Sequence, residues 1–253
     1  MKGSQFSLYF RHYLRRSLRE PFTLMIYIAL PVVISGVLNA IYTWNPSGST
    51  SLNGYNMVAT YISVGMMLLF QLSGGLYLLN YLYNDLMRPM KWRLKAAPGE
   101  TAVIIYAAAS CCTIFCALQG LLIVCLTAWL FNAYWGNLFV TVLTIFVVSI
   151  ISQMLGMLLL LLTRSVGVSE GIVWALSNAM AALGGMLFPL PDNALFGFVK
   201  IYGTPFSLAS SAIFESGFLK STQNSPWIFV LILLGIAVTL CWIAIPLGRR
   251  RLV

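Results

Sequence analysis

Uncharged apolar runs alternate with short polar segments along the whole chain. Six such runs occupy residues 22–43, 56–83, 101–131, 137–163, 171–188 and 225–247. An α-helix rises about 1.5 Å per residue, so about 20 residues cross the ~30 Å hydrocarbon core of a bilayer. Each run is near or above that length. The pattern therefore predicts an all-α integral membrane protein with six transmembrane helices, built as a single transmembrane domain over residues 1–253.

The basic residues predict how these helices are oriented. Of the 15 Lys and Arg residues, all but Lys200 and Lys220 lie in segments that would share one side of the membrane. These residues are Lys2, Arg11, Arg15, Arg16, Arg19, Arg88, Lys91, Arg93, Lys95, Arg164, Arg249, Arg250 and Arg251. Positive charge marks the cytoplasmic side of membrane proteins. We therefore expect a multi-pass protein of the plasma or inner membrane with both termini in the cytoplasm.

The amino-acid composition agrees with a membrane protein and argues against a soluble domain, nucleic-acid binding and a metal site. Only 8% of the residues are charged, against roughly 25% in soluble domains, so a sizeable water-soluble domain is excluded. The net charge of +9 lies at predicted membrane boundaries, which favours contact with membrane lipid and not with nucleic acid. The five cysteines lie in apolar runs and the single histidine, His12, in a basic segment, so no metal site is expected.

Residues 1–20 predict an amphipathic helix in the membrane interface. At 100° per residue, one face carries Phe6, Tyr9, Phe10, Tyr13, Leu14, Ser17 and Leu18. The opposite face carries Arg11, His12, Arg15, Arg16 and Arg19. An aromatic face opposite a basic face is typical of a helix that lies along the headgroups or against a partner. Pro21 would end this helix and start the first span.

The connection over residues 84–100 is unusually basic and aromatic. It contains Arg88, Lys91, Trp92, Arg93 and Lys95 between the acids Asp85 and Glu100. Pro89 at the start and Pro98-Gly99 at the end favour a short helix over residues 89–97. A compact helix of this kind on the cytoplasmic side favours docking of a partner. The simpler alternative is a turn anchored to the headgroups that only fixes topology.

A second unusual connection covers residues 189–215 on the outer side. It is too apolar for a soluble loop, and Pro and Gly interrupt it too often for a straight span. A re-entrant hairpin that dips into the outer half of the membrane would fit, provided that its backbone is buried in protein or lines a cavity. The alternative is an apolar loop packed over the outer ends of the spans.

The sequence offers no catalytic residues. All six acids fall at predicted interfaces or in outer loops, and no charge lies at mid-membrane, where ion-coupled transporters carry one. The chain has no G-x-x-x-x-G-K-[ST] phosphate loop and no H-E-x-x-H motif. We therefore expect no enzyme activity and no bound cofactor in this chain alone, and any energy must come from another polypeptide.

Neutral polar and small residues lie inside the predicted spans. Ser35 and Asn39 are four residues apart and share a face, while Gln71 and Asn178 lie in other spans. Ala181 and Gly185 form a small-x-x-x-small pair. Such residues join helices at about 0.6–2 kcal/mol each. The alternative is that some of them line a path for a bulky amphipathic substrate.

Four segments in order carry a family resemblance. They are REPFTLMIYIALP from Arg19 to Pro31 at the end of the basic helix, MRPMKWRLKAAPGE, GGMLFPLPDN and the C-terminal LGRRRLV. Together they resemble the permease subunits of type-2 family ABC exporters, the class that exports drugs, peptides and polysaccharides. The resemblance covers nearly the whole chain.

This resemblance implies half of a transporter that pairs with a second copy or a sister permease. It implies that residues 84–100 form a coupling helix, which docks on a separate cytosolic ATPase that binds ATP and Mg. The implied coupling residues are Asp85, Arg88, Trp92, Arg93 and Glu100. The implied residues of a substrate path or dimer seam are Ser35, Asn39, Gln71, Asn178, Ala181 and Gly185. The helix over residues 1–20 would lie beside the coupling helix, and residues 189–215 would cap the path.

The expected function is therefore export of a hydrophobic or amphipathic substrate, such as a drug, a peptide or a lipid-linked molecule. One alternative is a stand-alone membrane enzyme that acts on lipid carriers, which would need neither nucleotide nor a second protein. Another is an immunity or sensor protein that sequesters a peptide without transporting it.

Overall fold

The computed structural model describes residues 2–44, 51–52, 54–87, 101–188, 190–191, 193–217 and 225–252. Within this part of the chain, six helices are long and apolar enough to cross a membrane. They are Pro21–Thr43, Met57–Asp85, Ala102–Phe131, Leu138–Thr163, Val166–Leu183 and Pro226–Ala244. The prediction of a helical protein with six candidate spans is confirmed.

Most of the predicted boundaries lie close to the observed ones, but the fifth span is shifted. It begins at Val166 and not at residue 171, so Glu170 lies within its first turns. It ends at Leu183 because Gly184 closes the helix and Gly185 adopts a φ of +75°, a conformation that glycine tolerates without strain.

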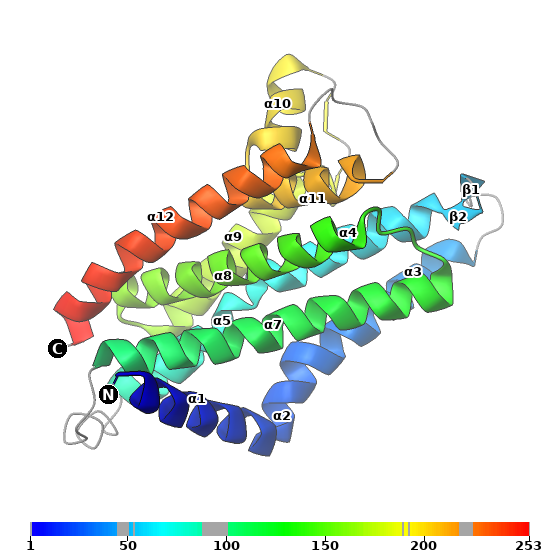
Figure 1. The fold of residues 1–253 in the computed structure, drawn as a ribbon. Coiled ribbons are helices and arrows are strands. Elements are labelled where there is room, and N and C mark those ends of the chain that lie inside the picture. The colour runs from blue at the N-terminus through cyan, green and yellow to red at the C-terminus, as the bar shows by residue number, and fades with distance from the viewer. Residues whose placement is uncertain are drawn as a thin grey trace.

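Several spans are interrupted, and short elements lie between them (Figure 1). The first span contains α2 (Pro21–Leu24), a π-helix η1 (Met25–Ala29) and α3 (Leu30–Thr43). The second contains α4 (Met57–Ser73), α5 (Gly75–Leu82) and a π-helix η2 (Tyr83–Met87). The other elements are α1 (Lys2–Arg19), β1 (Ser51–Leu52), β2 (Tyr55–Asn56), α7 (Thr101–Phe131), α8 (Leu138–Thr163), α9 (Val166–Leu183), α10 (Ala194–Tyr202), α11 (Pro205–Glu215) and α12 (Pro226–Leu252).

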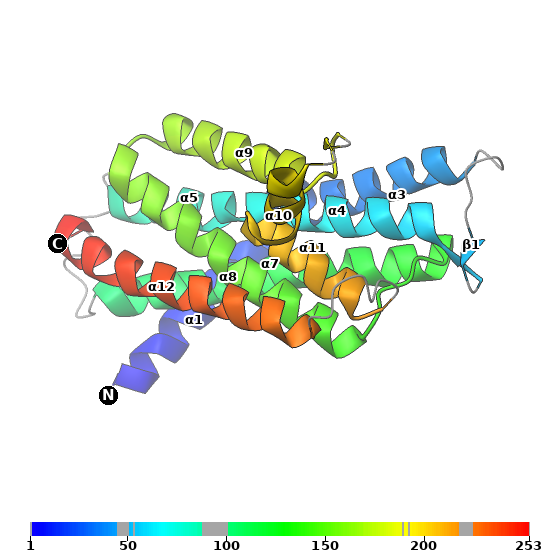
Figure 2. The same cartoon turned by 90° about the horizontal axis from the view of Figure 1, so that it is seen from above.

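The second span forms the centre of the bundle. Of the 18 residues in its most apolar stretch, 83% are buried. The corresponding share is 17% for the first span and 22% for the fifth. Helix α4 packs against α3, α7, α8, α9 and α11. Helices α3 and α9 flank it on the same face of the molecule (Figure 2). The outward faces of these two helices are therefore left for lipid or for another subunit.

Both termini lie at one end of the bundle, together with α1 (Figure 1). We call this the α1 end. The short antiparallel pair of β1 and β2, in which Ser51 pairs with Asn56, and the helices α10 and α11 lie at the opposite end, called the α11 end. An even number of crossings produces this arrangement. Both termini therefore lie on the same side of the membrane, and the number of crossings does not determine whether that side is the cytoplasm.

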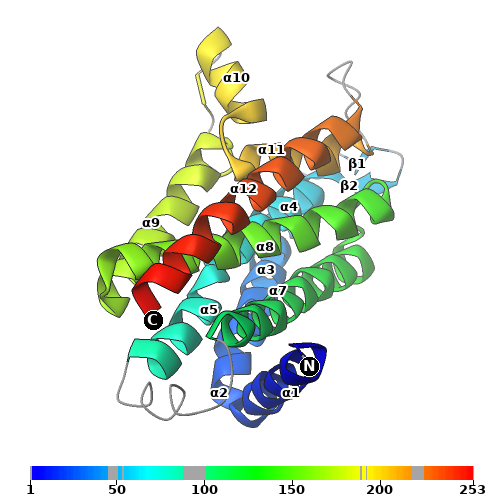
Figure 3. The ribbon, with the colours of Figure 1, turned by 60° about the vertical axis from the view of Figure 1, so that its left-hand side comes forward.

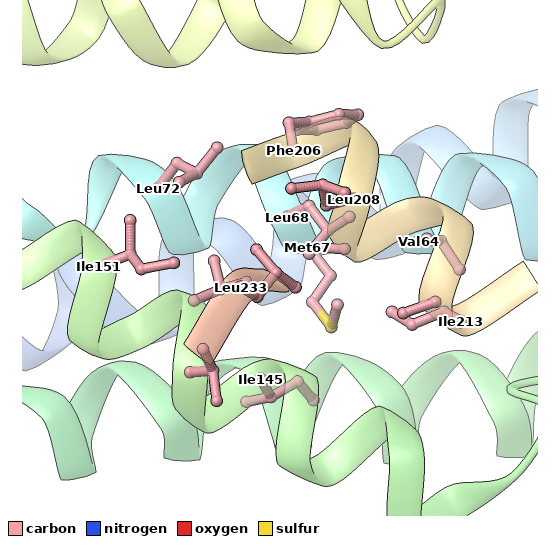
Figure 4. Close-up of a cluster of buried hydrophobic side chains, with 14 of the residues drawn as sticks. Val64, Met67, Leu68, Leu72, Ile145, Ile151, Phe206, Leu208, Ile213 and Leu233 are labelled. Atoms are coloured by element: carbon pink, nitrogen blue, oxygen red, sulfur yellow. The ribbon is translucent and has the colours of Figure 1, made fainter. Parts of the chain in front are cut away.

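Among the described residues, the buried apolar side chains form two clusters, one towards each end of the bundle. Towards the α11 end, aliphatic residues of α4 and α8 pack with Phe206 and Leu208 of α11 and Leu233 of α12 (Figure 4). Towards the α1 end, the core contains tyrosines and cysteines as well, including Tyr13, Tyr77 and Cys111. The core near α1 therefore contains hydroxyl and thiol groups among its apolar side chains.

Helices α10 and α11 form a helical hairpin whose two arms are buried to different extents. Helix α11 begins at Pro205, where Thr204 Oγ1 accepts a hydrogen bond of 3.0 Å from the Ser207 backbone N–H. Most residues of α11 are buried against α4, α8 and α12. Helix α10 has no buried residue and stands away from the bundle (Figure 3). Pro189 and Asp192 of the predicted segment lie outside the described residues.

Candidate functional site

A polar cluster at the α1 end ties α1 to the end of the second span. The Tyr13 hydroxyl donates a hydrogen bond of 2.8 Å to Asp85 Oδ2. Arg16 Nη1 donates one of 2.7 Å to Asp85 Oδ1, which is also an ion pair. Asp85 is only 6% exposed and lies in η2. We call Tyr13, Arg16, Ser17, Tyr81 and Asp85 the α1 clamp.

Helical spacing explains why these side chains converge. Tyr13 and Ser17 are four residues apart on one face of α1, Arg16 lies at the edge of that face, and Tyr81 and Asp85 are four apart on the second span. The Ser17 hydroxyl lies 3.1 Å from the Tyr81 hydroxyl. The Arg16 guanidinium carbon lies 4.6 Å from the centre of the Tyr81 ring, within cation–π range. Each residue of the clamp therefore contacts the opposite helix.

Charge and burial reinforce the clamp. Burial raises the pKa of the Tyr13 hydroxyl above its usual range, and the neighbouring Asp85 carboxylate raises it further. Burial lowers the pKa of Arg16, but the hydrogen bond and charge of Asp85, with Glu20, outweigh this and leave that pKa raised. Tyr13 therefore remains a hydrogen-bond donor and Arg16 a cation throughout the physiological range.

One arginine of the predicted basic face of α1 does not face outward. Arg11, Arg15 and Arg19 are exposed, as a headgroup-facing surface requires. Arg16 was predicted on the same face, but its side chain turns inward and is only 25% exposed. It does so because the buried carboxylate of Asp85 lies within hydrogen-bond distance. Arg16 also bonds Glu20 Oε1 at 3.1 Å, so it joins two acids.

The clamp includes Asp85, which lies at the start of the predicted coupling segment over residues 84–100. Of the five predicted coupling residues, only Asp85 is described, and it is the acid that α1 holds. Arg88, Trp92, Arg93 and Glu100 lie outside the described residues. The sequence placed Asp85 in this segment but gave no signal for its partners on α1.

A second polar region surrounds the break between α4 and α5. The backbone N–H of Gly74 bonds to the Gln71 carbonyl at 3.1 Å, one residue closer than in a regular α-helix. Side chains of neighbouring helices bond to the carbonyls around this break. Ser152 Oγ donates to Leu72 O at 2.8 Å, and Gln153 Nε2 donates to Gly74 O at 3.1 Å. A break inside a membrane is tolerated when neighbours satisfy the backbone in this way.

Gln71 supports the same region from within. Its amide nitrogen donates to Ser149 Oγ at 2.6 Å and to the Cys116 carbonyl at 3.1 Å. Gln71 and Ser149 are fully buried. The amide therefore joins α4, α7 and α8 at one point, which accounts for this polar side chain in an apolar span.

A third cluster links the first, second and fifth spans. Asn80 Nδ2 donates to Glu170 Oε1 at 2.9 Å and lies 3.3 Å from the Tyr27 hydroxyl, to which it also donates. Tyr27 lies in η1, Asn80 in α5 and Glu170 in α9. Local sequence patterns point neither to Tyr27 nor to a pairing of Asn80 with Glu170. The only signal was an acid at the start of an apolar run.

The predicted path or seam residues fall into two groups. Ser35, Asn39, Gln71 and Ala181 are fully buried inside the chain, and the Ser63 hydroxyl donates to Asn39 Oδ1 at 3.3 Å. Asn178 is exposed on α9. Gly185 accepts a hydrogen bond of 2.6 Å from the Tyr61 hydroxyl. Their assignment to a path or seam stays a prediction.

Among the residues that the structure describes, no three His, Cys, Asp or Glu side chains are grouped closely enough to hold a metal ion. No protein-family model matches the chain, and a search of the curated proteins finds no match. The chain is therefore a multi-pass helical membrane protein with six candidate spans.

Proposed function

We propose that this chain is the membrane subunit of an ATP-driven exporter that moves a hydrophobic or amphipathic substrate out of the cytoplasm. The α1 clamp carries the proposal. It joins the basic N-terminal helix to Asp85, which lies at the start of the basic and aromatic segment over residues 84–100. A mechanical link at this place is what an ATPase docked on that segment would need in order to move the spans.

The proposal places the α1 end in the cytoplasm of a plasma or inner membrane. Thirteen of the 15 basic residues lie in segments that this orientation makes cytoplasmic. In the same orientation, α10 and α11 form a re-entrant hairpin in the outer half of the membrane. The burial of α11 between α4, α8 and α12 supports this, because irregular backbone at membrane depth needs protein around it.

The proposal also includes a second copy or a sister permease. Helices α3 and α9 lie on one face and are the least buried of the spans. The exposed surface of α9 carries Asn178 and Trp174, and that of α3 carries Val33 and Val37. Pairing through this face would enclose a path between two subunits, with ATP and Mg bound by the partner ATPase.

Affinity purification of the tagged chain in mild detergent, followed by mass spectrometry, tests the proposal. We expect a stoichiometric protein with a phosphate loop, and we expect Trp92→Ala with Arg93→Ala to lose it. Trp129→Ala is the matched control, because Trp129 is 85% exposed at the opposite end of the bundle. Recovery of the folded chain alone, or full ATP-dependent export by the double variant, would overturn the proposal.

A further inference from the structure

A cleft at the α11 end is large enough for a ligand. Its volume is about 710 Å³, and its walls come from α4, the turn after α9, α10 and α11. Small-molecule sites have volumes of about 300–1,000 Å³. The cleft therefore suits a molecule of lipid size and is too small for a folded peptide chain.

The walls of the cleft are mostly apolar, and contacts hold several of their aromatic side chains in place. Phe206 is 1% exposed and packs so closely on Gly184 that a Cβ there would lie 2.5 Å from its ring. The ring of Tyr61 stacks on Phe214 at 5.9 Å, and its hydroxyl is held by Gly185 O at 2.6 Å. Val64 and Phe206, two of the lining residues, are labelled in Figure 4. Hydrocarbon can pack against such walls without leaving polar groups unpaired.

Two residues of opposite charge line the same cleft. Lys200 comes from α10 and Glu215 from the end of α11. The aliphatic stem of Lys200 lies beside Gly185, where a Cβ would be 3.4 Å from its Cε. A cation and an acid at one apolar cleft match a head that carries both a phosphate and an amine.

We propose that this cleft binds a single-chain amphiphile with a zwitterionic head, its hydrocarbon lying between α4 and α11. Lys200 binds the phosphate and Glu215 binds the amine. The proposal goes beyond the proposed function and does not depend on an ATPase, because binding requires only this chain.

A substitution at Gly65 changes the volume of the cleft. A Cβ at this position would meet the thioether of Met186, which is the flexible end of a side chain that also lines the cleft. Gly65→Ala therefore pushes Met186 into the cleft, and Met186→Ala in the same chain restores the room. This pair separates loss of space from loss of fold.

Native mass spectrometry of the purified chain tests the proposal. The probes are lysophosphatidylethanolamine, which has a phosphate and an amine, and lysophosphatidylglycerol with the same acyl chain, which has only the phosphate. We expect Lys200→Gln to weaken binding of both probes about fivefold, since a charge-assisted bond is lost. Glu215→Gln should weaken only the first. Gly65→Ala should weaken both about tenfold through overpacking, with rescue by Met186→Ala.

Thr239→Ala is the matched control, because Thr239 is an exposed polar residue of α12 that does not line the cleft. It should bind both probes as the parent does. Equal binding by all variants would mean adsorption around the spans only and would overturn the proposal. That result would leave recovery of the ATPase unchanged, so it is distinct from failure of the proposed function.

Discussion

At the residue scale, Asp85 matters because two donors from α1 meet its two oxygens. Tyr13 and Arg16 approach at 2.8 and 2.7 Å, and the Asp85 side chain is only 9% exposed. Water cannot easily replace either donor at such a site. The loss of one charge therefore leaves the other poorly solvated.

A double-mutant cycle on Arg16→Gln and Asp85→Asn measures this interaction. Each single change should lower the free energy of unfolding by about 1.5–3 kcal/mol, the range for hydrogen bonds to charged groups. The double variant should lose clearly less than the sum, because neither charge is then left alone. Unfolding by SDS titration in mixed micelles gives the values. Arg15→Gln is the control, since Arg15 is exposed on the same helix; additive losses in the cycle would contradict the clamp.

Helical periodicity predicted the faces of α1 but not the direction of Arg16. At 100° per residue, Arg16 falls with Arg15 and Arg19, and the pattern carries no information about an acid 69 positions later. The same holds for Asn80 and Glu170, which are 90 residues apart. Long-range partners decide such side chains, and local spacing cannot supply them.

At the element scale, apolar length was sufficient to predict the spans. The break between α4 and α5 was not predictable, because residues 56–83 read as one apolar run. Its backbone is stabilised by Ser152 and Gln153, which belong to another helix. The Pro and Gly content of residues 189–215 predicted that no straight span lies there, and re-entry into the membrane stays a prediction. The unequal burial of α10 and α11 depends on the packing of α11 in the core.

Helices α5 and α8 cross where two glycines meet. A Cβ on Gly156 would collide with the Gly75 carbonyl, and one on Gly75 with the Ser152 carbonyl. Backbone cannot move aside as a flexible side chain can. Gly156→Ala should therefore lower the free energy of unfolding by about 1–3 kcal/mol, the usual cost of overpacking.

The same SDS titration provides a matched control for this prediction. A Cβ on Gly235 of α12 would meet no atom within 4 Å. Gly235→Ala should leave stability unchanged or raise it by up to about 1 kcal/mol, because alanine favours helix more than glycine. Equal effects of the two changes would show that close contact at the crossing is unimportant.

At the scale of the whole molecule, α1 and α10 lie at opposite ends (Figure 1). Arg15→Cys and Asn193→Cys place thiols at exposed sites near each end. With a membrane-impermeant maleimide on intact cells, Asn193→Cys should react at once and Arg15→Cys only after permeabilisation. The parent chain, which has five cysteines, sets the background.

The order of labelling tests two predictions separately: that α1 and α10 lie on opposite sides of the membrane, and that α1 lies in the cytoplasm. Reaction of both sites from one side would contradict the placement of α1 and α10 across a membrane. The reverse order would keep the fold and overturn only the proposed orientation. Charge distribution predicts that orientation from the sequence, whereas the fold fixes only that both termini share a side.

Asp85 lies two residues before Met87, the last described residue ahead of position 88, and α1 leads through Glu20 directly into α2. Tyr13 and Arg16 of α1 bond to Asp85, so the first and second spans are connected at this point. We expect a displacement of the chain near residue 87 to move both spans. The number of residues between this connection and the first span is therefore constrained by the position of the second span. An inserted residue between Arg19 and Pro21 would shift and rotate the first span relative to the second, even though it altered no contact inside either span.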